Sequence, residues 1–357
     1  MKRTLVSIAL LGAIGPAAHA QSAITIYGLV DGGIEAERGG IAGNIVKVSS
    51  GIGAASRLGF KGVEDLGGGL SALFVLESGL LIDTGTSDVA GAAFNRQAFL
   101  GLKDQRLGAI TLGRQYTLTY NALGQVGDPF GAGLAGSAKN LFPVAGANLR
   151  SNNSVIYTSP AWNGLTAEAL YSVGEVAGNS SAGRQFNLGL NYTRGPLNAR
   201  LAYNNRNNDT AAVTTNGIGH NTLFVANYDF TAAKLFFAYS ADKGMNSAPL
   251  NNATPRPYGR VFNPSLKGDD LLLGAHIRVG AAGTIIASYI RKNDKTAPNQ
   301  DARQYAVGYT YALSKRTSAY ASYGMITNRN GAAYTVGNNS DAGTGDRATN
   351  IGVRHSF

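Results

Sequence analysis

Apolar and polar residues alternate along most of this chain, in segments of about ten residues. In the clearest segment, Gln185–Tyr192, every second residue is apolar, beginning at Phe186. After a turn at Gly195 and Pro196, the run Leu197–Asn204 repeats the pattern. A period of two places successive side chains on opposite faces of a strand. The two runs therefore predict a β-hairpin with a single apolar face.

The same alternation predicts about sixteen strands in all. Besides the hairpin above, the candidates are Ile24–Ile34, Ser56–Glu64, Leu70–Ser78, Phe94–Lys103, Ala109–Arg114, Ser154–Ser159, Leu165–Val173, Thr222–Asp229, Lys234–Ala241, Asp270–Val279, Thr284–Arg291, Arg303–Tyr311, Thr317–Met325 and Thr349–Phe357. Two of these, Phe94–Lys103 and Ala109–Arg114, alternate poorly, so the pattern fixes the number of strands only to within about two.

Short and long connections follow one another in strict alternation between these strands. Seven are turns such as Pro160–Gly164, and eight are long polar loops such as Ala36–Ala55. This asymmetry is typical of outer-membrane barrels, which have short periplasmic turns and long external loops. A sheet that spans hydrocarbon must also close on itself, because lipid offers its edges no hydrogen-bond partner. The pattern thus predicts an all-β fold, a transmembrane antiparallel β-barrel with a water-filled lumen. An exported soluble β-sandwich is the alternative.

The first twenty residues have the features of a signal peptide. Lys2 and Arg3 precede the apolar stretch Leu5–Ile14, and the small-x-small sequence Ala18-His19-Ala20 follows it. This order of charge, apolar stretch and small residues is that of a cleaved export signal, and the apolar stretch is too short to span a bilayer. We expect residues 1–20 to be removed and residues 21–357 to form the barrel domain in a Gram-negative outer membrane.

The third long connection, Gln115–Asn153, differs from the others. It is rich in Gly and Ala and contains little charge, but it includes apolar residues such as Phe130 and Phe142. Loops of this length are usually functional or disordered, and a disordered segment would have fewer apolar residues. We expect residues 115–153 to fold inward against the barrel wall and to narrow the channel.

Composition excludes several functions. The chain has no Cys, which excludes disulfides and thiolate metal sites. Its formal net charge is +10, but Lys and Arg form no dense run of the kind that binds nucleic acid. No catalytic, metal-binding or cofactor-binding motif is present, so we predict no catalytic residue, metal or cofactor. An outer-membrane barrel hydrolase, or an adhesin or receptor acting through its loops, is the alternative to a channel.

Several motifs resemble those of the general porins of β-proteobacteria. They are Ile24–Asp31 (ITIYGLVD), Ser56–Leu70 (SRLGFKGVEDLGGGL), Leu112–Gln115 (LGRQ), Leu313–Thr317 (LSKRT) and Gly352–Phe357 (GVRHSF). The resemblance covers the whole chain in order. It implies a sixteen-stranded homotrimeric barrel that lets small ions and hydrophilic solutes diffuse passively, with the third external loop in the pore. It also implies contact with outer-membrane lipid and lipopolysaccharide. A final strand that ends in Phe357 is similar to the signal for the outer-membrane assembly machinery.

The resemblance also implies the residues of a pore constriction. In anion-selective members, arginines on the wall face acidic residues on the inserted loop. The matching arginines are Arg57, Arg96 and Arg150, with Arg114 as a fourth candidate. Asp128 matches the loop carboxylate, and Glu77 is a candidate from the wall. Guanidinium groups keep their charge, and charges that line a narrow pore select among ions. Asn95 and Gln97 stand where further basic residues could be, so we expect only a modest anion preference.

Overall fold

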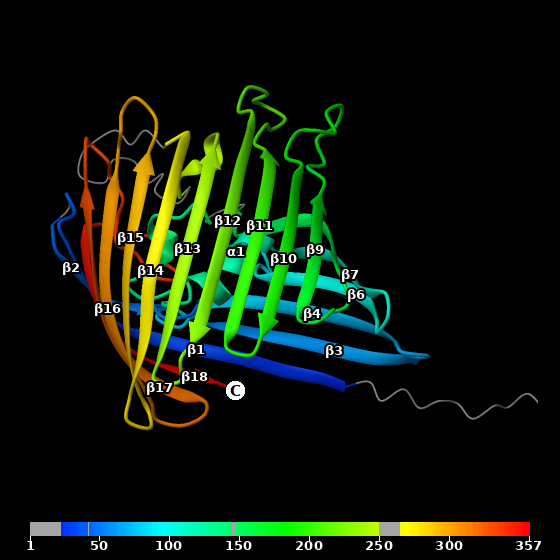
Figure 1. The fold of residues 1–357 in the computed structure, drawn as a ribbon, viewed down its shortest axis with the longest axis horizontal. Helices are drawn as coiled ribbons and strands as arrows, with labels where there is room; N and C mark the ends of the chain where they lie inside the picture. Colours follow the sequence, from blue (N-terminus) through cyan, green and yellow to red (C-terminus); the bar gives the residue numbers. More distant parts are fainter. Residues whose placement is uncertain (1–22, 42, 145–147, 250–264) are drawn as a thin grey trace, which may run out of the picture.

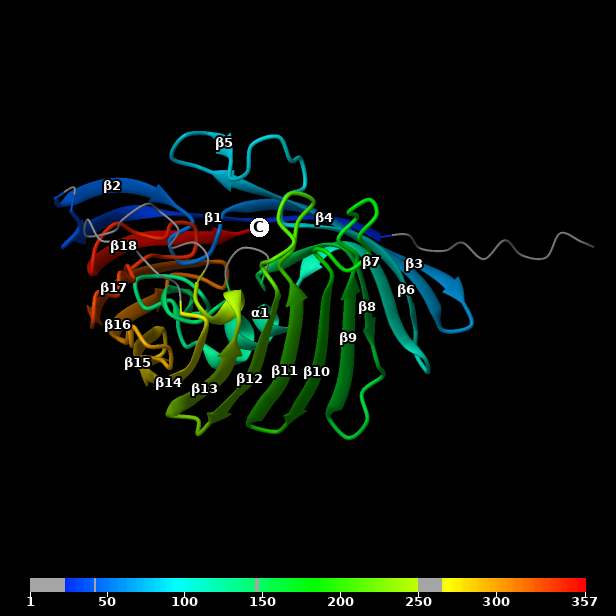
Figure 2. The ribbon, with the colours of Figure 1, turned by 90° about the horizontal axis from the view of Figure 1, so that it is seen from above.

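The computed structural model describes residues 23–41, 43–144, 148–249 and 265–357, and in it the chain forms one closed antiparallel barrel (Figures 1 and 2). The predicted signal peptide lies outside the described residues. The first half contains β1 (Ala23–Arg38), β2 (Ile45–Ser50), β3 (Arg57–Gly67), β4 (Leu70–Leu81), β5 (Thr86–Ser87), β6 (Gln97–Asp104), β7 (Gly108–Tyr116), β8 (Arg150–Thr158) and β9 (Leu165–Ser172). The second half contains β10 (Gln185–Arg194), β11 (Leu197–Asn207), β12 (Ile218–Asp229), β13 (Ala233–Lys243), β14 (Lys267–Val279), β15 (Gly283–Asp294), β16 (Ala302–Ala312), β17 (Thr317–Asn328) and β18 (Arg347–Ser356).

These labels correspond to sixteen wall strands in the described part of the chain. β2 and β3 together form the second wall strand, because both pair with β1, and residues 51–56 leave the sheet between them. β5 is a two-residue strand that pairs only with the end of β4. The predicted barrel of about sixteen strands is therefore confirmed. The alternation missed β2, which lies within the first long loop, and it began the fourth wall strand, β6, at Phe94 instead of Gln97.

The barrel closes where β1 pairs with β18, in a register that sets Gly33 opposite Gly352. At the end of the chain, Gly28 N–H donates to the Phe357 carbonyl, and Phe357 N–H donates to the Gly28 carbonyl, both at 3.1 Å. Closure removes the unpaired strand edges that hydrocarbon cannot satisfy. The antiparallel order of the strands and the closure between β1 and β18 match the predicted membrane-spanning fold.

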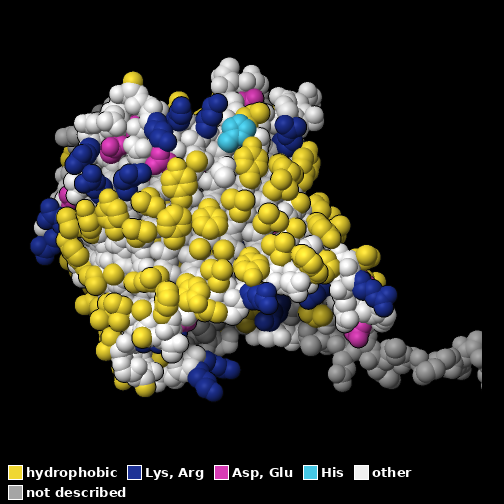
Figure 3. Space-filling view, viewed as in Figure 1, with side chains coloured by type: hydrophobic (Ala, Val, Ile, Leu, Met, Phe, Trp, Pro, Cys, Tyr) yellow, Lys and Arg dark blue, Asp and Glu magenta, His cyan; other side chains and the backbone are white. Residues whose placement is uncertain are grey.

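A broad apolar belt surrounds the barrel (Figure 3). On β16, Tyr305, Val307 and Tyr309 are exposed, whereas the alternate residues Gln304 and Ala306 are buried on the inner face. This period-two pattern is that of a strand with lipid outside and a polar lumen inside. Aromatic side chains are frequent within the belt, as expected near membrane interfaces.

The short turns lie at the end of the barrel that carries the C-terminus, and the long loops lie at the other end (Figure 1). In the turn between β3 and β4, Gly67, Gly68 and Gly69 all have positive φ, at 86°, 64° and 89°. Side chains rarely adopt three such conformations in succession, so the GGG sequence permits this tight turn. These three glycines thus form the tight turn between β3 and β4.

The third long loop folds into the lumen, as predicted. Loop L3 (residues 117–149) contains α1 (Leu118–Ala122), the π-helical turn η1 (Leu123–Gly127) and the 3₁₀ turn η2 (Ala138–Asn140). Figure 2 shows α1 inside the ring of strands. Apolar loop residues such as Leu123 and Phe142 are buried in one cluster with wall residues such as Val225 and Leu272. This burial holds L3 against the inner wall. Among the described residues, no helix is long and apolar enough to cross a membrane.

Candidate functional site: the pore constriction

A carboxylate and two arginines of the expected constriction lie together on the wall, in β3, β4 and the residue before β6. The Glu77 carboxylate accepts a hydrogen bond from Arg96 Nε at 2.7 Å, and Arg57 Nε lies 3.8 Å from it. The Tyr27 hydroxyl donates to the same carboxylate at 3.1 Å. Glu77 and Arg96 are only 4% and 3% exposed. The carboxylate therefore fixes Arg96 and neutralises part of the local positive charge.

Two tyrosines hold the arginines in place. The Tyr116 hydroxyl accepts hydrogen bonds from Arg96 at 2.6 Å and from Arg150 at 3.4 Å. The Arg150 guanidinium also lies 4.9 Å from the centre of the Tyr116 ring, which in turn stacks on Tyr120 at 4.9 Å. Cation–π contact and stacking restrict the planar guanidinium group. Sequence reasoning missed both tyrosines, because they fell within the predicted loop 115–153, where nothing in the local sequence shows that they contact the arginines.

Arg114 is held by the backbone around the second long loop. Its Nε donates to the Asn95 carbonyl at 2.7 Å, and its guanidinium also donates to the Asn152 side chain. The Asn95 side-chain oxygen accepts from Gly79 N–H at 3.0 Å. Asn95, which stands where a further basic residue could be, thus helps to hold Arg114 in position.

Asp128 has surroundings that the sequence did not predict. Its carboxylate is 3% exposed and accepts hydrogen bonds from three backbone N–H groups of L3, those of Phe130, Ala132 and Ala138, at 2.8–2.9 Å. Burial raises its pKa to about 6, although these hydrogen bonds oppose the rise. The side chain ties L3 together from inside the loop, and it is not among the residues that line the lumen cavity described below.

Lys139 is the charged residue of L3 that does line this cavity. Its ammonium donates to the Asn339 carbonyl at 2.5 Å. Burial between the loops lowers its pKa to about 8, and the positive charges of Arg150 and Arg96 add to this effect, while Asp128 opposes it. Sequence reasoning missed Lys139. The available signal was that it is the one basic residue within 115–149.

The cavity is open and has a volume of about 690 Å³. Its charged lining comprises five cationic side chains, Arg96, Arg114, Lys139, Arg150 and Arg206, and one carboxylate, Asp88. In the described part of the chain, Nε of Arg150 and Nε of Arg206 are buried and have no hydrogen-bond partner. The arrangement leaves positive charge available to a solute in the lumen.

A second loop also enters the lumen. Loop L8 (residues 329–346) joins β17 to β18, and its residues Asn339 and Ser340 line the same cavity. The Asn339 side chain donates to the Ala132 carbonyl of L3 at 2.9 Å and accepts from Ala55 N–H at 3.1 Å. L3, L8 and the segment 51–56 thereby contact one another inside the barrel. The sequence predicted only the inward fold of L3.

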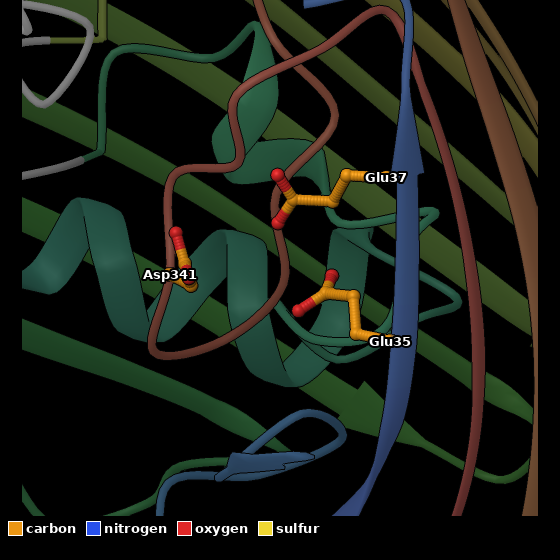
Figure 4. A group of neighbouring side chains, drawn as sticks. All are labelled: Glu35, Glu37 and Asp341. Carbon is orange, nitrogen blue, oxygen red and sulfur yellow. The ribbon is translucent and has the colours of Figure 1, made fainter. Parts of the chain in front are cut away.

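A cluster of acidic residues attaches L8 to the wall. Figure 4 shows Glu35 and Glu37 of β1 with Asp341 of L8, their carboxyl groups close together. The Lys47 ammonium from β2 lies 2.5 Å from both Glu37 and Asp341, and 3.6 Å from Glu35. Lys47 thus supplies positive charge at the centre of a group that could otherwise attract a metal ion. We interpret the cluster as a structural attachment of L8.

Comparisons with known proteins agree with this architecture. The model of a family described as Gram-negative porin matches residues 7–332. The chain is 30% identical to an outer membrane porin protein of Bordetella pertussis and 30% identical to outer membrane porin protein 32 of Delftia acidovorans, and each match covers both chains completely. A solved structure of an anion-selective porin from Comamonas acidovorans has a TM-score of 0.76 and 28% identity, over 94% of this chain and all of that one.

Proposed function

The chain belongs to the Gram-negative porin family, and from this premise we propose that its channel prefers small anions to cations. The protein is an outer-membrane porin, a channel for passive diffusion of small hydrophilic solutes. Porins are channels without enzymatic activity, so the protein is not an enzyme and the hydrolase alternative is rejected.

One observation carries the proposed selectivity: five cationic side chains and a single carboxylate line the cavity beside L3. Positive charge lies on both sides, because Arg96, Arg114 and Arg150 come from the wall and Lys139 comes from the loop. Fixed charges act strongly on a solute in a narrow lumen, where little water separates them from it. The similar solved porin of Comamonas acidovorans is described as anion-selective, which supports the same direction.

We assign different roles to the residues expected from the sequence. Arg96, Arg114 and Arg150, which line the cavity, are wall cations of the proposed filter. Arg57 does not line the cavity and acts through its neighbour Glu77, 3.8 Å away. Glu77 is the buried counter-charge of Arg57 and Arg96. It orients Arg96 and weakens the positive field that the arginines produce in the lumen. Asp128 shapes L3 and contributes no filter charge, because its carboxylate is enclosed by backbone N–H groups.

The test is the reversal potential of the purified porin in planar bilayers under a KCl gradient. We expect the sign that corresponds to chloride permeation, and a larger effect at low salt, because the Debye length grows from about 10 Å at 0.1 M to about 30 Å at 0.01 M. A reversal potential of the opposite sign would reject the proposed selectivity and leave the channel function intact.

We further propose a homotrimer in outer-membrane lipid and lipopolysaccharide, delivered after cleavage behind Ala20 and recognised for assembly through Phe357. Exposed outward residues such as Ile24, Ile26 and Ile351 support burial against lipid or a neighbouring subunit. Unboiled protein should migrate as a large oligomer on SDS gels and boiled protein as a monomer, and N-terminal sequencing should begin at Gln21. A monomer in mild detergent would reject the trimer.

A further inference from the structure

Cationic residues lie opposite one another on the outer surface, near the loop end of β13–β16. Lys243 of β13 is the cross-strand partner of Lys267 of β14, and Arg291 of β15 is the partner of Arg303 of β16. All four belong to the outward set of their strands, which alternates with inward residues such as Lys292. Figure 3 shows Lys and Arg side chains gathered above the apolar belt on this face.

The like charges of these cross-strand pairs repel each other and so destabilise the folded barrel. Side chains directly across an antiparallel pair have Cβ atoms about 4.5–5.5 Å apart, and like charges at this distance are destabilising. The neighbouring residue Lys292 faces inward, is fully buried and forms an ion pair with Asp270 at 3.0 Å. On the inner face at this height, the positive charge is therefore balanced by a carboxylate. The outward surface has no comparable balance of charge.

Asp269 is the carboxylate that pairs with two of the outward cations. Asp269 accepts from Arg291 at 3.0 Å, from Lys295 at 2.5 Å and from Asn293 at 3.0 Å. Within the described residues, Lys243, Lys267 and Arg303 form no ion pair. Among the residues that the structure describes, these three cations thus have no protein counter-charge, and they lie on a surface that faces sideways, toward the membrane.

The height of this group on the barrel indicates which kind of anion it meets. Tyr289 and Tyr305 face outward one step further toward the middle of β15 and β16, with ring centroids 5.2 Å apart. The exposed Leu273 of β14 is the cross-strand partner of Tyr289. Such tyrosines mark the boundary between hydrocarbon and headgroups. The cations just beyond them lie at the level of the outer-leaflet headgroups.

We propose that Lys243, Lys267, Arg291, Lys295 and Arg303, the rim patch, bind the phosphate groups of lipopolysaccharide. Guanidinium and ammonium groups suit phosphate oxygens, and Arg can bind them in bidentate geometry. Neighbouring strands lie about 4.8 Å apart, so the four strands extend over roughly 15 Å, enough for more than one phosphate. The inference rests on the proposed lipid partner and names its binding site.

Lipopolysaccharide retention tests the proposal. Full-length protein purified in detergent is mixed with lipopolysaccharide, with dephosphorylated lipopolysaccharide or with phosphatidylglycerol, and binding is measured by native mass spectrometry. The variant Lys243→Gln/Lys267→Gln/Arg303→Gln removes cations that have no ion pair. Each cation near an anionic membrane surface contributes roughly fivefold in affinity, so the triple variant should bind lipopolysaccharide roughly a hundredfold more weakly.

The matched control is Arg106→Gln/Lys315→Gln/Arg316→Gln, which removes three exposed cations from turns at the opposite end. It should bind lipopolysaccharide as the natural protein does. Equal loss in both triple variants, unchanged binding by the rim variant, or equal binding of the dephosphorylated lipid or phosphatidylglycerol would overturn the proposal. Conductance and reversal potential in bilayers without lipopolysaccharide should be unchanged in the rim variant, and they report separately on the proposed selectivity.

Discussion

Lys139 offers the sharpest test of how the constriction selects ions. A unit charge about 6 Å from an anion in a wet lumen, at an effective dielectric constant near 60, contributes about 1 kcal/mol. This corresponds to roughly a fivefold change in anion partitioning. We therefore expect Lys139→Gln to reduce the ratio of chloride to potassium permeability at least about fivefold, because the lost charge also no longer repels potassium. The barrel should stay intact, because the ammonium bonds only to a loop carbonyl.

The pH dependence of selectivity separates Lys139 from the arginines. Its pKa is lowered to about 8, so the side chain is charged below pH 8 and becomes neutral as pH rises through that value. The charged groups that face it, Arg96 and Arg150 on the wall, remain protonated, while Asp128 of its own loop, with a pKa of about 6, is already ionised at pH 7. Anion preference should therefore fall between pH 7 and pH 9 in the natural protein.

The assay is the reversal potential in planar bilayers at 0.1 M salt or less, measured at pH 7 and at pH 9. Lys139→Arg should keep the preference at both pH values, and Lys139→Gln should have the reduced preference at both. Lys243→Gln, on the outer surface, is the control and should differ little from the natural protein. If Lys139→Arg retains the full pH dependence, or if Lys139→Gln has normal selectivity, the lysine does not act on permeating ions.

Two further variants test the supports of the filter. Arg96→Gln should weaken anion preference and destabilise the barrel by about 3 kcal/mol, because the buried Glu77 loses its closest cation and keeps only the Tyr27 hydroxyl and Arg57 at 3.8 Å; adding Glu77→Gln should restore much of the stability. Heat-modified mobility in SDS measures this, and an unchanged transition in the single variant would contradict the buried pair. Asp128→Ala should cost about 1–3 kcal/mol for each N–H group left without a partner, loosening L3. Single-channel recording should then show higher or noisier conductance, and a current identical to that of the natural protein would argue against the role of Asp128.

The barrel could be predicted from the sequence because its determinants are local. A lipid face and a water-filled lumen impose a period of two on each strand, and the turns and loops alternate in length along the chain. β2 escaped prediction because residues 51–56 interrupt the wall strand, and that departure depends on contacts with L3 and L8 rather than on a local pattern. The inward fold of L3 followed from its apolar composition, whereas L8 is polar and gave no such signal.

The site was only partly predictable. The arginines were expected through resemblance, and their role in a filter remains a proposal. The partners that orient them depend on register between distant strands, as with Tyr116 opposite Arg150. Lys139 and Arg206 could not be distinguished from solvated cations, because sequence does not show the depth of a side chain in a lumen. Asp128 also had a local interpretation, since Asp often bonds to the N–H two residues later, as it does here with Phe130.

The attachment of L8 by Lys47 and its neighbours has a consequence for the order of assembly. Asn338 of L8 donates to Glu35, and Thr344 N–H donates to Glu37, across more than 300 residues of sequence. Contacts at such separation form late, since they require the two ends of the chain to meet. L8 immediately precedes β18, the strand that seals the barrel against β1. We therefore expect L8 to take its place in the lumen only as the two ends of the sheet join. Closing the seam between the first and last strands would then also bring L8 to the lumen cavity that the proposed filter lines.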